Sequence, residues 1–309
     1  MSINIYNNII ANYEASSLLN KEQFNRLAST DFLDAVKILF SYGYVDAGTL
    51  DIDAIMLAQY KKLFLFLTEH STSSTLLKFI LSRYYYLDAK TLYLENCTVD
   101  ELYLNDVKLK KAIVNKKYDA LAKPLQVALK SLNENSSRKE IDFAFLDANF
   151  KDNLTLANSL GKKYLEYAKY EIDLSNILTA YRAKKLNFSF RDFYSNLFCG
   201  GTIDLEEFEC LKDNSFDFFA YGLSGTSISN VIRSLKLGDT STFKANSDQF
   251  LFGILSNEMT SLLKHGAFLT YALCYLSEFK VVNFILVSLK NNIKINKDQL
   301  WSVANDIYI

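Results

Sequence analysis

The stretch that decides the fold is residues 160–201, which read LGKKYLEYAKYEIDLSNILTAYRAKKLNFSFRDFYSNLFCGG. Its apolar residues recur every four positions at Leu160, Tyr164, Ala168 and Ile172. After a small phase shift the apolar stripe continues at Ile177, Leu178 and Tyr181. That period is typical of an amphipathic α-helix. The pattern therefore predicts one long helix from residue 160 onward.

A polar signature lies near the middle of this predicted helix. Asp173-x-x-Asn176 is followed, thirteen residues after Asn176, by Ser189, which opens the sequence Ser-Phe-Arg-Asp192-Phe193. A hydroxyl residue followed three positions later by an acid is close to a capping box, which marks the start of a helix. We therefore expect a second, shorter helix to begin at this point.

The same arrangement recurs twice elsewhere in the chain. Asn283 is followed, again thirteen residues later, by Asn296, and Asp88-x-x-Thr91 is followed after only seven residues by Thr98, which opens Thr-Val-Asp-Glu-Leu. The repeated unit is thus centred near residues 88, 173 and 280. We predict three related helical domains, over residues 1–106, 107–201 and 202–309.

The composition supports a helical protein with a large core. Of the 309 residues 50% are hydrophobic and 22% are charged, so the chain can bury a sizeable interior. A single proline and ten glycines leave few of the breakers that a sandwich or barrel needs for its turns. The predicted fold class is all-α. We expect helices near residues 32–39, 72–96, 107–135 and 139–155 and a Glu-rich helix over residues 205–212. A polar loop at residues 133–137 is expected between the helices at 107–135 and 139–155.

The charge balance argues against nucleic acid as a partner. The net charge is −1, so no overall field attracts the chain to nucleic acid or to an anionic membrane. One local run of lysines comprises Lys108, Lys110, Lys111, Lys116 and Lys117. Such a run is more typical of a solvated helix face than of a phosphate or lipid-headgroup contact.

The sequence predicts no catalytic residue, no cofactor and no metal. The four cysteines lack C-x-x-C spacing, which fits reduced thiols, and His70 and His265 lack the partners that a metal site or a triad needs. Neither a phosphate-binding loop nor a G-x-S-x-G motif is present. The two most apolar stretches of the C-terminal part, Gly266–Leu276 and Val281–Leu289, each fall short of the ~20 residues of a membrane helix. We therefore expect any membrane attachment to be indirect, through other proteins.

The signature residues are open to two interpretations. Asp173 and Asn176 lie on one face of their predicted helix, and a polar contact that sets the register between adjacent helices is favoured over a ligand site. Arg182, about one and a half turns past Asn176, is expected to be the prominent charge on the same face. It could pair with an acid of a neighbouring unit or bind a partner protein through its planar guanidinium.

These motifs resemble a known family. The segment Tyr170–Lys184 resembles the repeated Asp-x-x-Asn-[Ile/Leu]…Arg-[Ala/Gly]-Lys signature of the C subunit of bacterial and archaeal V/A-type ATPases, which is called the d subunit in eukaryotic vacuolar pumps. Residues 16–24 (SSLLNKEQF) and 40–44 (FSYGY) resemble that family's "x-Ser-Leu-Leu-x-x-Glu-x-Phe" and "Leu-x-x-Thr-x-Tyr" motifs, so the likeness covers essentially the whole chain.

The chain departs from the family pattern at several positions. Residues 8–12 (NIIAN) lack both arginines of the family's Asn-Ala-Arg-x-Arg motif. Thr91 replaces Asn in the first copy, Lys280 replaces Glu in the third, and both copies lack the arginine that the second has at Arg182. The chain is thus similar to a divergent member of the family.

The resemblance implies a funnel of three helical domains in pseudo-threefold arrangement that performs no chemistry. In this family the protein joins the central shaft to the membrane proteolipid ring of the pump, so the implied partners are the shaft and ring subunits and the implied location is the cytoplasmic face of the membrane. Two alternatives from other classes are a helical-repeat scaffold or adaptor unrelated to the pump and a helical metal phosphohydrolase. The missing His-Asp pair argues against the enzyme.

Overall fold

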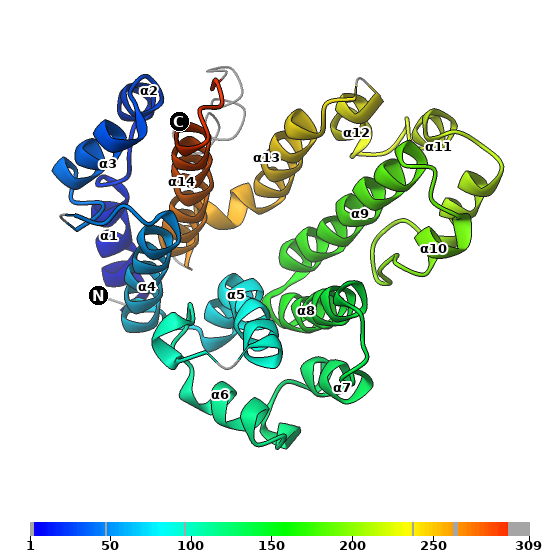
Figure 1. Ribbon diagram of the computed structural model, residues 1–309, viewed down its shortest axis with the longest axis horizontal. Coiled ribbons are helices and arrows are strands. Elements are labelled where there is room, and N and C mark those ends of the chain that lie inside the picture. The colour runs from blue at the N-terminus through cyan, green and yellow to red at the C-terminus, as the bar shows by residue number, and fades with distance from the viewer. Residues whose placement is uncertain (1–2, 47, 96, 237, 262–264, 296–309) are drawn as a thin grey trace. The chain divides into compact units, whose positions relative to one another are not determined.

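The structure is a computed structural model that describes residues 3–46, 48–95, 97–236, 238–261 and 265–295. Helices account for every regular element of these residues, and no strand occurs among them. The all-α fold class is therefore confirmed (Figure 1). The contacts divide the chain into two compact units, unit 1 with residues 1–80, 100–105 and 256–309, and unit 2 with residues 81–99 and 106–255. The division into three domains stays a prediction.

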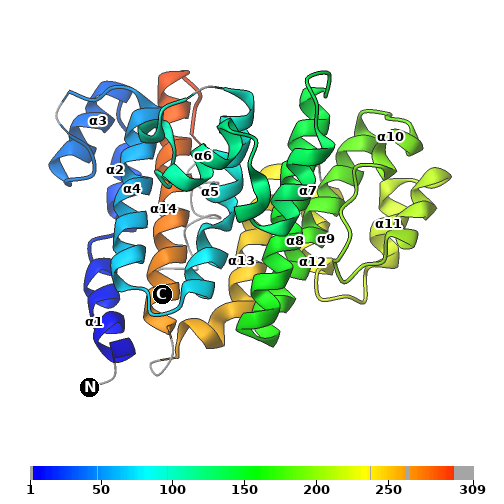
Figure 2. The ribbon, with the colours of Figure 1, turned by 90° about the horizontal axis from the view of Figure 1, so that it is seen from below.

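Unit 1 contains the helices from both ends of the chain. They are α1 (Ile3–Ala15), α2 (Lys21–Ala28), α3 (Phe32–Ser41), α4 (Ile52–His70) and α14 (Gly266–Lys290), and α5 (Ser74–Leu94) begins here. The long α14 packs against α1, α2, α3 and α4, and Figure 2 shows it beside α4. Aromatic rings fill the contact between α14 and α4, since Phe279 meets Tyr60 at 4.2 Å and Tyr271 meets Phe66 at 4.7 Å between ring centroids. Helix α14 is therefore the core of unit 1.

Helix α14 corrects one expectation about membranes. The two apolar stretches that looked too short separately join into one helix of 25 residues, and by length and composition it could cross a membrane. In the structure 61% of its most apolar window is buried against the rest of the chain. Because the surrounding helices already cover it, we assign α14 to the interior of the bundle.

Unit 2 is built around two long helices, α8 and α9, that follow one another in the chain and pack as neighbours. Its elements are most of α5, η1 (Val99–Glu101, shared with unit 1), α6 (Val107–Val114), η2 (Tyr118–Ala120), α7 (Lys123–Ser131), α8 (Arg138–Leu160), α9 (Lys162–Lys185), α10 (Phe190–Tyr194), η3 (Leu205–Lys212), α11 (Phe216–Gly222), α12 (Ser229–Lys236) and most of α13 (Thr240–Met259). Helix α8 packs against both α7 and α9. The far half of α9 covers an aromatic core that includes Phe193, Phe208 and Phe219.

Local signals set most of the helix starts. Asp31 caps α3 and Ser189 caps α10, each side chain accepting the backbone N–H three residues later, and the cap at Ser189 was expected. Ser137 and Glu140 form a full capping box at the start of α8, and the expected loop at 133–137 precedes it.

Four expected helices differ from the structure. The helix predicted from residue 160 begins at Lys162, because Gly161 has φ +126° and ends α8 there, so Leu160 belongs to α8. The helix predicted over 107–135 is broken into α6, η2 and α7, because Lys116 is left-handed (φ +54°) and Pro124 lies in the first turn of α7. The segments at Thr98 and at 205–212 form 3-10 rather than α-helices. The predicted cap at Asn296 lies outside the described residues.

Candidate functional site

The signature of helix α9 faces a loop, residues 198–203, that joins α10 to η3. Asp173 and Asn176 are three positions apart, so they lie on one face of the helix, and both side chains are fully buried. The sequence predicted a polar contact of these residues with an adjacent helix. The structure shows the polar contact, but its partner is the backbone of the loop.

The carboxylate of Asp173 accepts hydrogen bonds from two consecutive backbone groups. Thr202 N–H donates to Oδ1 and Oδ2 at 3.0 and 2.9 Å, and Ile203 N–H donates to Oδ1 at 3.1 Å. The hydroxyl of Thr202 donates to Oδ2 as well. The start of the following segment is thus fastened to the middle of α9.

Asn176 fastens the other end of the same loop. Its Nδ2 donates to the carbonyl of Phe198 at 2.8 Å, and the N–H of Phe198 donates back to Oδ1 at 2.8 Å. This reciprocal pair imitates the hydrogen bonding of a backbone strand, so it fixes the orientation of the loop as well as its position. The ring of Phe198 then packs on Phe143 and Phe150, each at 4.9 Å between centroids.

Two glycines allow the loop to approach the helix this closely. A Cβ at Gly201 would lie 2.0 Å from Oδ1 of Asp173, far inside contact distance. Gly200 has φ +102°, and a Cβ there would lie 2.6 Å from Cδ1 of Leu154. The sequence Phe-Cys-Gly-Gly is therefore matched to Asp173 and Asn176, and we call the whole arrangement the α9 clamp: Asp173, Asn176, Phe198, Gly200, Gly201, Thr202 and Ile203.

The electrostatics of the α9 clamp favour a structural role. Burial raises the pKa of Asp173 above its ordinary value, and the hydrogen bonds from Thr202 and Ile203 oppose that shift. Both carboxylate oxygens are already occupied by these donors, and the side chain has no exposed surface. The clamp therefore offers no open position for a substrate or a metal ion.

The remaining signature residues are not brought to the clamp. Arg182 is exposed, and no ion pair of this residue is found in the part of the chain that the structure describes. It lies nine positions after Asp173, which at 100° per residue is the opposite side of α9, and not on the face of Asn176 as expected. Asp88 is buried within α5, and Thr91, one turn on, is half-buried. Asn283 is exposed on α14.

One buried carboxylate was missed by the sequence analysis. Glu278 of α14 is only 2% exposed and accepts a hydrogen bond from the N–H of Leu19 at 2.5 Å. Burial raises its pKa to about 7, while the Leu19 N–H and the charge of Lys62 act in the opposite direction. The signal was available, because Glu278 and Lys280 are the only charged residues between Gly266 and Leu289. Lys280, which the sequence analysis placed at this position of the repeat, is exposed.

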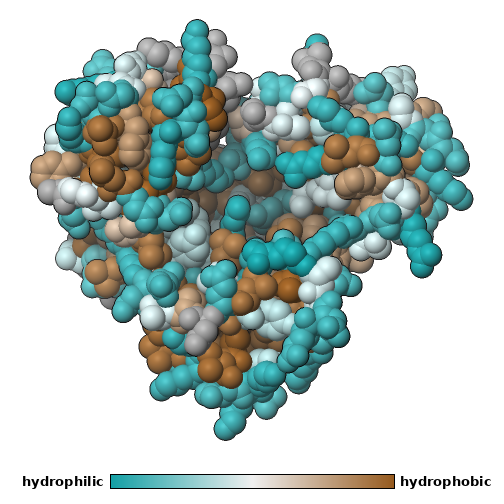
Figure 3. Space-filling view, in the orientation of Figure 1, coloured by the Kyte–Doolittle hydropathy of each residue, from teal (hydrophilic) through white to brown (hydrophobic). Residues whose placement is uncertain are grey.

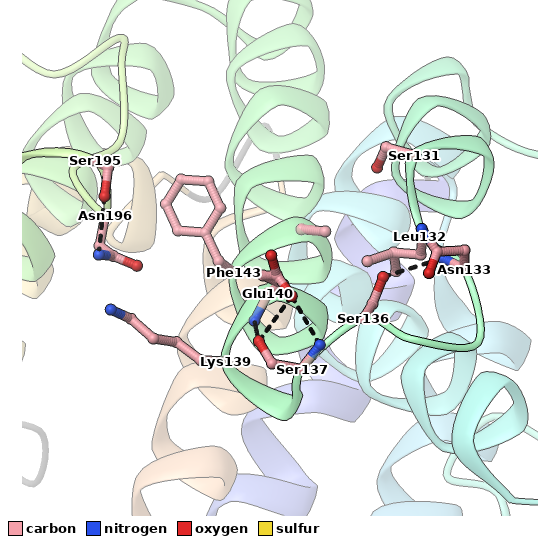
Figure 4. A pocket seen from close by; sticks show the side chains of 11 residues that line it. Ser131, Leu132, Asn133, Ser136, Ser137, Lys139, Glu140, Phe143, Ser195 and Asn196 are labelled. Carbon is pink, nitrogen blue, oxygen red and sulfur yellow. Dashed lines mark hydrogen bonds between the residues drawn. The ribbon is translucent and has the colours of Figure 1, made fainter. Parts of the chain in front are cut away.

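The pocket at the start of α8 does not suggest a ligand either. Figure 4 shows it between the 131–137 segment and Asn196, with a volume of about 560 Å³. An anion would be drawn to the free N–H groups of this helix start. The carboxylate of Glu140 already accepts from the N–H and hydroxyl of Ser137, and these bonds lower the pKa of Glu140. The local negative charge therefore disfavours a bound anion.

The other titratable groups do not form a metal site in the described residues. No group of three His, Cys, Asp or Glu side chains comes together there. His70 ends α4, and His265 precedes α14, where its Nδ1 lies 3.3 Å from the hydroxyl of Thr72. Burial lowers the pKa of His265, so this ring is mainly neutral at neutral pH.

The comparison with protein families decides what kind of protein this is. The sequence model of the ATP synthase (C/AC39) subunit family matches residues 14–297, nearly the whole chain. The chain belongs to this family. It is therefore a member of the C/d family of V/A-type ATPase subunits, as the resemblance of its repeated motifs suggested. No curated protein matches the chain in a direct sequence search. The α9 clamp and Glu278 both lie within the part that matches the C/AC39 family.

Proposed function

We propose that this chain is the non-catalytic central-stalk component that couples the rotating shaft of a V/A-type ion-translocating ATPase to its membrane proteolipid ring. The observation that carries the proposal is the match to the C/AC39 family over residues 14–297. The family assignment also argues against a helical scaffold unrelated to the pump. In this proposal the chain is held at the cytoplasmic face of the membrane by the other proteins of the complex.

The internal contacts support a role in transmitting torque. A coupling element must keep its shape under load, and close-packed helices are poorly compressible. Hydrogen bonds of buried residues fasten one loop to α9 at both ends, through Asp173 and Asn176. A second tie joins Glu278 of α14 to Leu19 in the segment before α2. These ties use buried polar groups to fix the connections between helices, which is where a helical bundle deforms most easily.

The test is to isolate the complex from the cells in which the chain is made. A tagged copy should bring down a small, strongly apolar proteolipid together with the shaft proteins, as identified by mass spectrometry after gentle detergent extraction. A tagged copy of an unrelated helical protein of similar size is the control. Recovery of the chain with neither the proteolipid nor the shaft proteins would overturn the proposal.

A second measurement addresses coupling itself. In membrane vesicles lacking this chain, ATP hydrolysis by the soluble catalytic part should continue while ATP-driven ion uptake is lost, and added chain should restore uptake. Both proton and sodium uptake are measured, since the proposal holds for either ion. Unchanged uptake in the absence of the chain would contradict the coupling role.

A further inference from the structure

The segment from Val107 to Lys130 is the most positively charged part of the surface. It contains seven lysines and a single acid, Asp119. The segment carries +6 and the whole chain −1, so the other residues together carry −7. The segment thus carries a local excess of positive charge on α6, η2 and α7, all of which belong to unit 2.

The folded helices place lysines and valines together on their outer faces. Helix α6 buries Leu109, Ala112 and Ile113, which leaves Val107 (48% exposed), Lys108, Lys111 and Val114 (55% exposed) on the side facing solvent. Helix α7 buries Leu125, Ala128 and Leu129 and exposes Lys123, Val127 and Lys130. We call the exposed set the α6–α7 surface: Val107, Lys108, Lys111, Val114, Lys116, Lys117, Lys123, Val127 and Lys130. In the lower part of Figure 3, over these helices, hydrophilic and hydrophobic residues lie side by side.

The lysines of this surface form no ion pair with any acid among the residues that the structure describes. The neighbouring α8, in contrast, pairs Lys151 with Asp147 at 2.6 Å and Arg138 with Asp142 at 3.8 Å. A solvated helix usually interleaves its lysines with acids in this way. The sequence favoured a solvated face for the lysine run, but the folded α6–α7 surface lacks that interleaving.

The exposed valines distinguish the kind of anion that this surface fits. Val127 is 67% exposed and lies on one stripe with Lys123 and Lys130, at spacings of four and three residues. Lysines with apolar residues between them on an outer helix face are typical of segments that lie in the headgroup region of a bilayer, where the ammonium groups meet phosphates and the apolar groups enter the acyl boundary. Nucleic acid is a poorer fit, because the segment has no arginine and its only aromatic residue, Tyr118, is half-buried.

We propose that the α6–α7 surface binds the anionic headgroups of a phospholipid bilayer directly. The contact is independent of the proposed function, because it concerns protein-free lipid and needs no other protein. It adds a direct lipid contact to the attachment through other proteins that the proposed function describes. Each lysine near an anionic membrane surface contributes on the order of a fivefold change in binding.

The test uses sedimentation of the full chain with protein-free vesicles. The chain should sediment with vesicles that mix phosphatidylserine and phosphatidylcholine and stay in solution with pure phosphatidylcholine. Binding should be strong at about 0.01 M salt and largely lost at about 1 M, where the screening length falls from about 30 Å to about 3 Å. Absence of binding to the anionic vesicles at low salt overturns the proposal, and so does equal binding to neutral vesicles.

A matched pair of variants locates the site. Lys108→Gln, Lys111→Gln and Lys117→Gln together should weaken binding at least tenfold. The control changes three exposed lysines elsewhere in unit 2, Lys139→Gln, Lys162→Gln and Lys212→Gln, which removes the same net charge. Far-UV circular dichroism checks that both variants keep their helix content. Equal weakening by the two sets would show a response to net charge alone and would overturn the assignment to the α6–α7 surface.

A further variant separates a membrane from an acidic protein as the partner. Val114→Ser with Val127→Ser keeps every charge and should still weaken vesicle binding about threefold or more, because the apolar side chains no longer enter the bilayer. Soluble polyglutamate is the competing probe. If polyglutamate binds the chain as tightly as the vesicles do, and the valine variant binds vesicles normally, the surface recognises an acidic polymer and the proposal fails.

Discussion

The α9 clamp makes a prediction that depends on one short distance. Gly201→Ala places a methyl group where the Cβ would lie 2.0 Å from Oδ1 of Asp173. Gly201 does not have a positive φ, so an alanine there is strained only by this overlap. To make room, the loop must retreat by more than about 1 Å, which removes the hydrogen bonds of Asp173 with Thr202 and Ile203.

The expected magnitudes follow from the hydrogen bonds that are lost. A hydrogen bond to a charged acceptor contributes about 1.5–3 kcal/mol, and the raised pKa of Asp173 shows that part of this is offset by its burial. We therefore expect Asp173→Ala and Gly201→Ala each to lower the free energy of unfolding by about 2–4 kcal/mol. In the double variant the methyl group occupies the space that the carboxylate has left. Its free energy of unfolding should equal that of Asp173→Ala to within about 1 kcal/mol, so the coupling is about as large as the cost of Gly201→Ala alone, about 2–4 kcal/mol.

The assay is thermal unfolding followed by far-UV circular dichroism. For a domain of 150–250 residues about 1 kcal/mol corresponds to 2–4 °C, so each single variant should lower Tm by roughly 4–16 °C. Gly222→Ala is the matched control, because no atom lies within 4 Å of a Cβ built there, and it should shift Tm by less than about 2 °C. If the costs of Asp173→Ala and Gly201→Ala simply add in the double variant, the reasoning from the short distance is refuted.

Three further predictions concern buried acid, thiols and nucleotide. The pKa of Glu278 is 4.5 in the unfolded chain and about 7 in the folded protein, so the contribution of this residue to stability is fully present below about pH 4.5 and is lost as the pH rises through 7. The variant Glu278→Gln still accepts a hydrogen bond from Leu19 N–H and should remove up to about 3 kcal/mol of that loss. Urea unfolding that shows the same pH dependence in both proteins would contradict this prediction. A thiol reagent at mildly alkaline pH should modify the exposed Cys199 and leave Cys274 unmodified, because burial raises the pKa of Cys274 to about 12. Peptide mapping that finds Cys274 modified in the native protein would contradict this prediction. The isolated chain should not bind ATP with micromolar affinity in calorimetry, because the sequence has no phosphate-binding loop, and such binding would count against the proposed function.

The sequence could predict the helices and the position of the α9 clamp because both rest on local spacing. Caps at Asp31 and Ser189 are read from residues that are three positions apart, and the Asp173-x-x-Asn176 pair lies on one face by the helix period alone. The partner of that pair was not predictable in the same way. It lies more than twenty residues further along the chain, and only the folded loop brings it within hydrogen-bond distance.

The misses also have local physical causes. The apolar stripe continues from Leu160 through Gly161, so periodicity alone hides the end of α8, which depends on a backbone φ that only glycine adopts easily. In the third copy the thirteen-residue spacing pointed to Asn283 and Lys280. Both are exposed, while Glu278, two positions before Lys280, is buried. A lone acid within a long apolar helix is a stronger signal of a buried polar contact than the spacing that was used.

Helices α9 and α14 make the same kind of hydrogen-bonded contact with two different connecting segments. In each a buried acid near the middle of a long helix accepts the backbone N–H of a segment that leads into another helix, Thr202 before η3 and Leu19 before α2. The first connection joins residues 29 positions apart, whereas the second joins residues 259 positions apart. Unit 1 therefore cannot complete its core until α14 has been made, while unit 2 has all its residues by position 255. Since domains fold as units during synthesis, unit 2 is expected to fold first, and docking of α14 onto α1–α4, with the hydrogen bond of Glu278 to Leu19, should complete the core of unit 1 later.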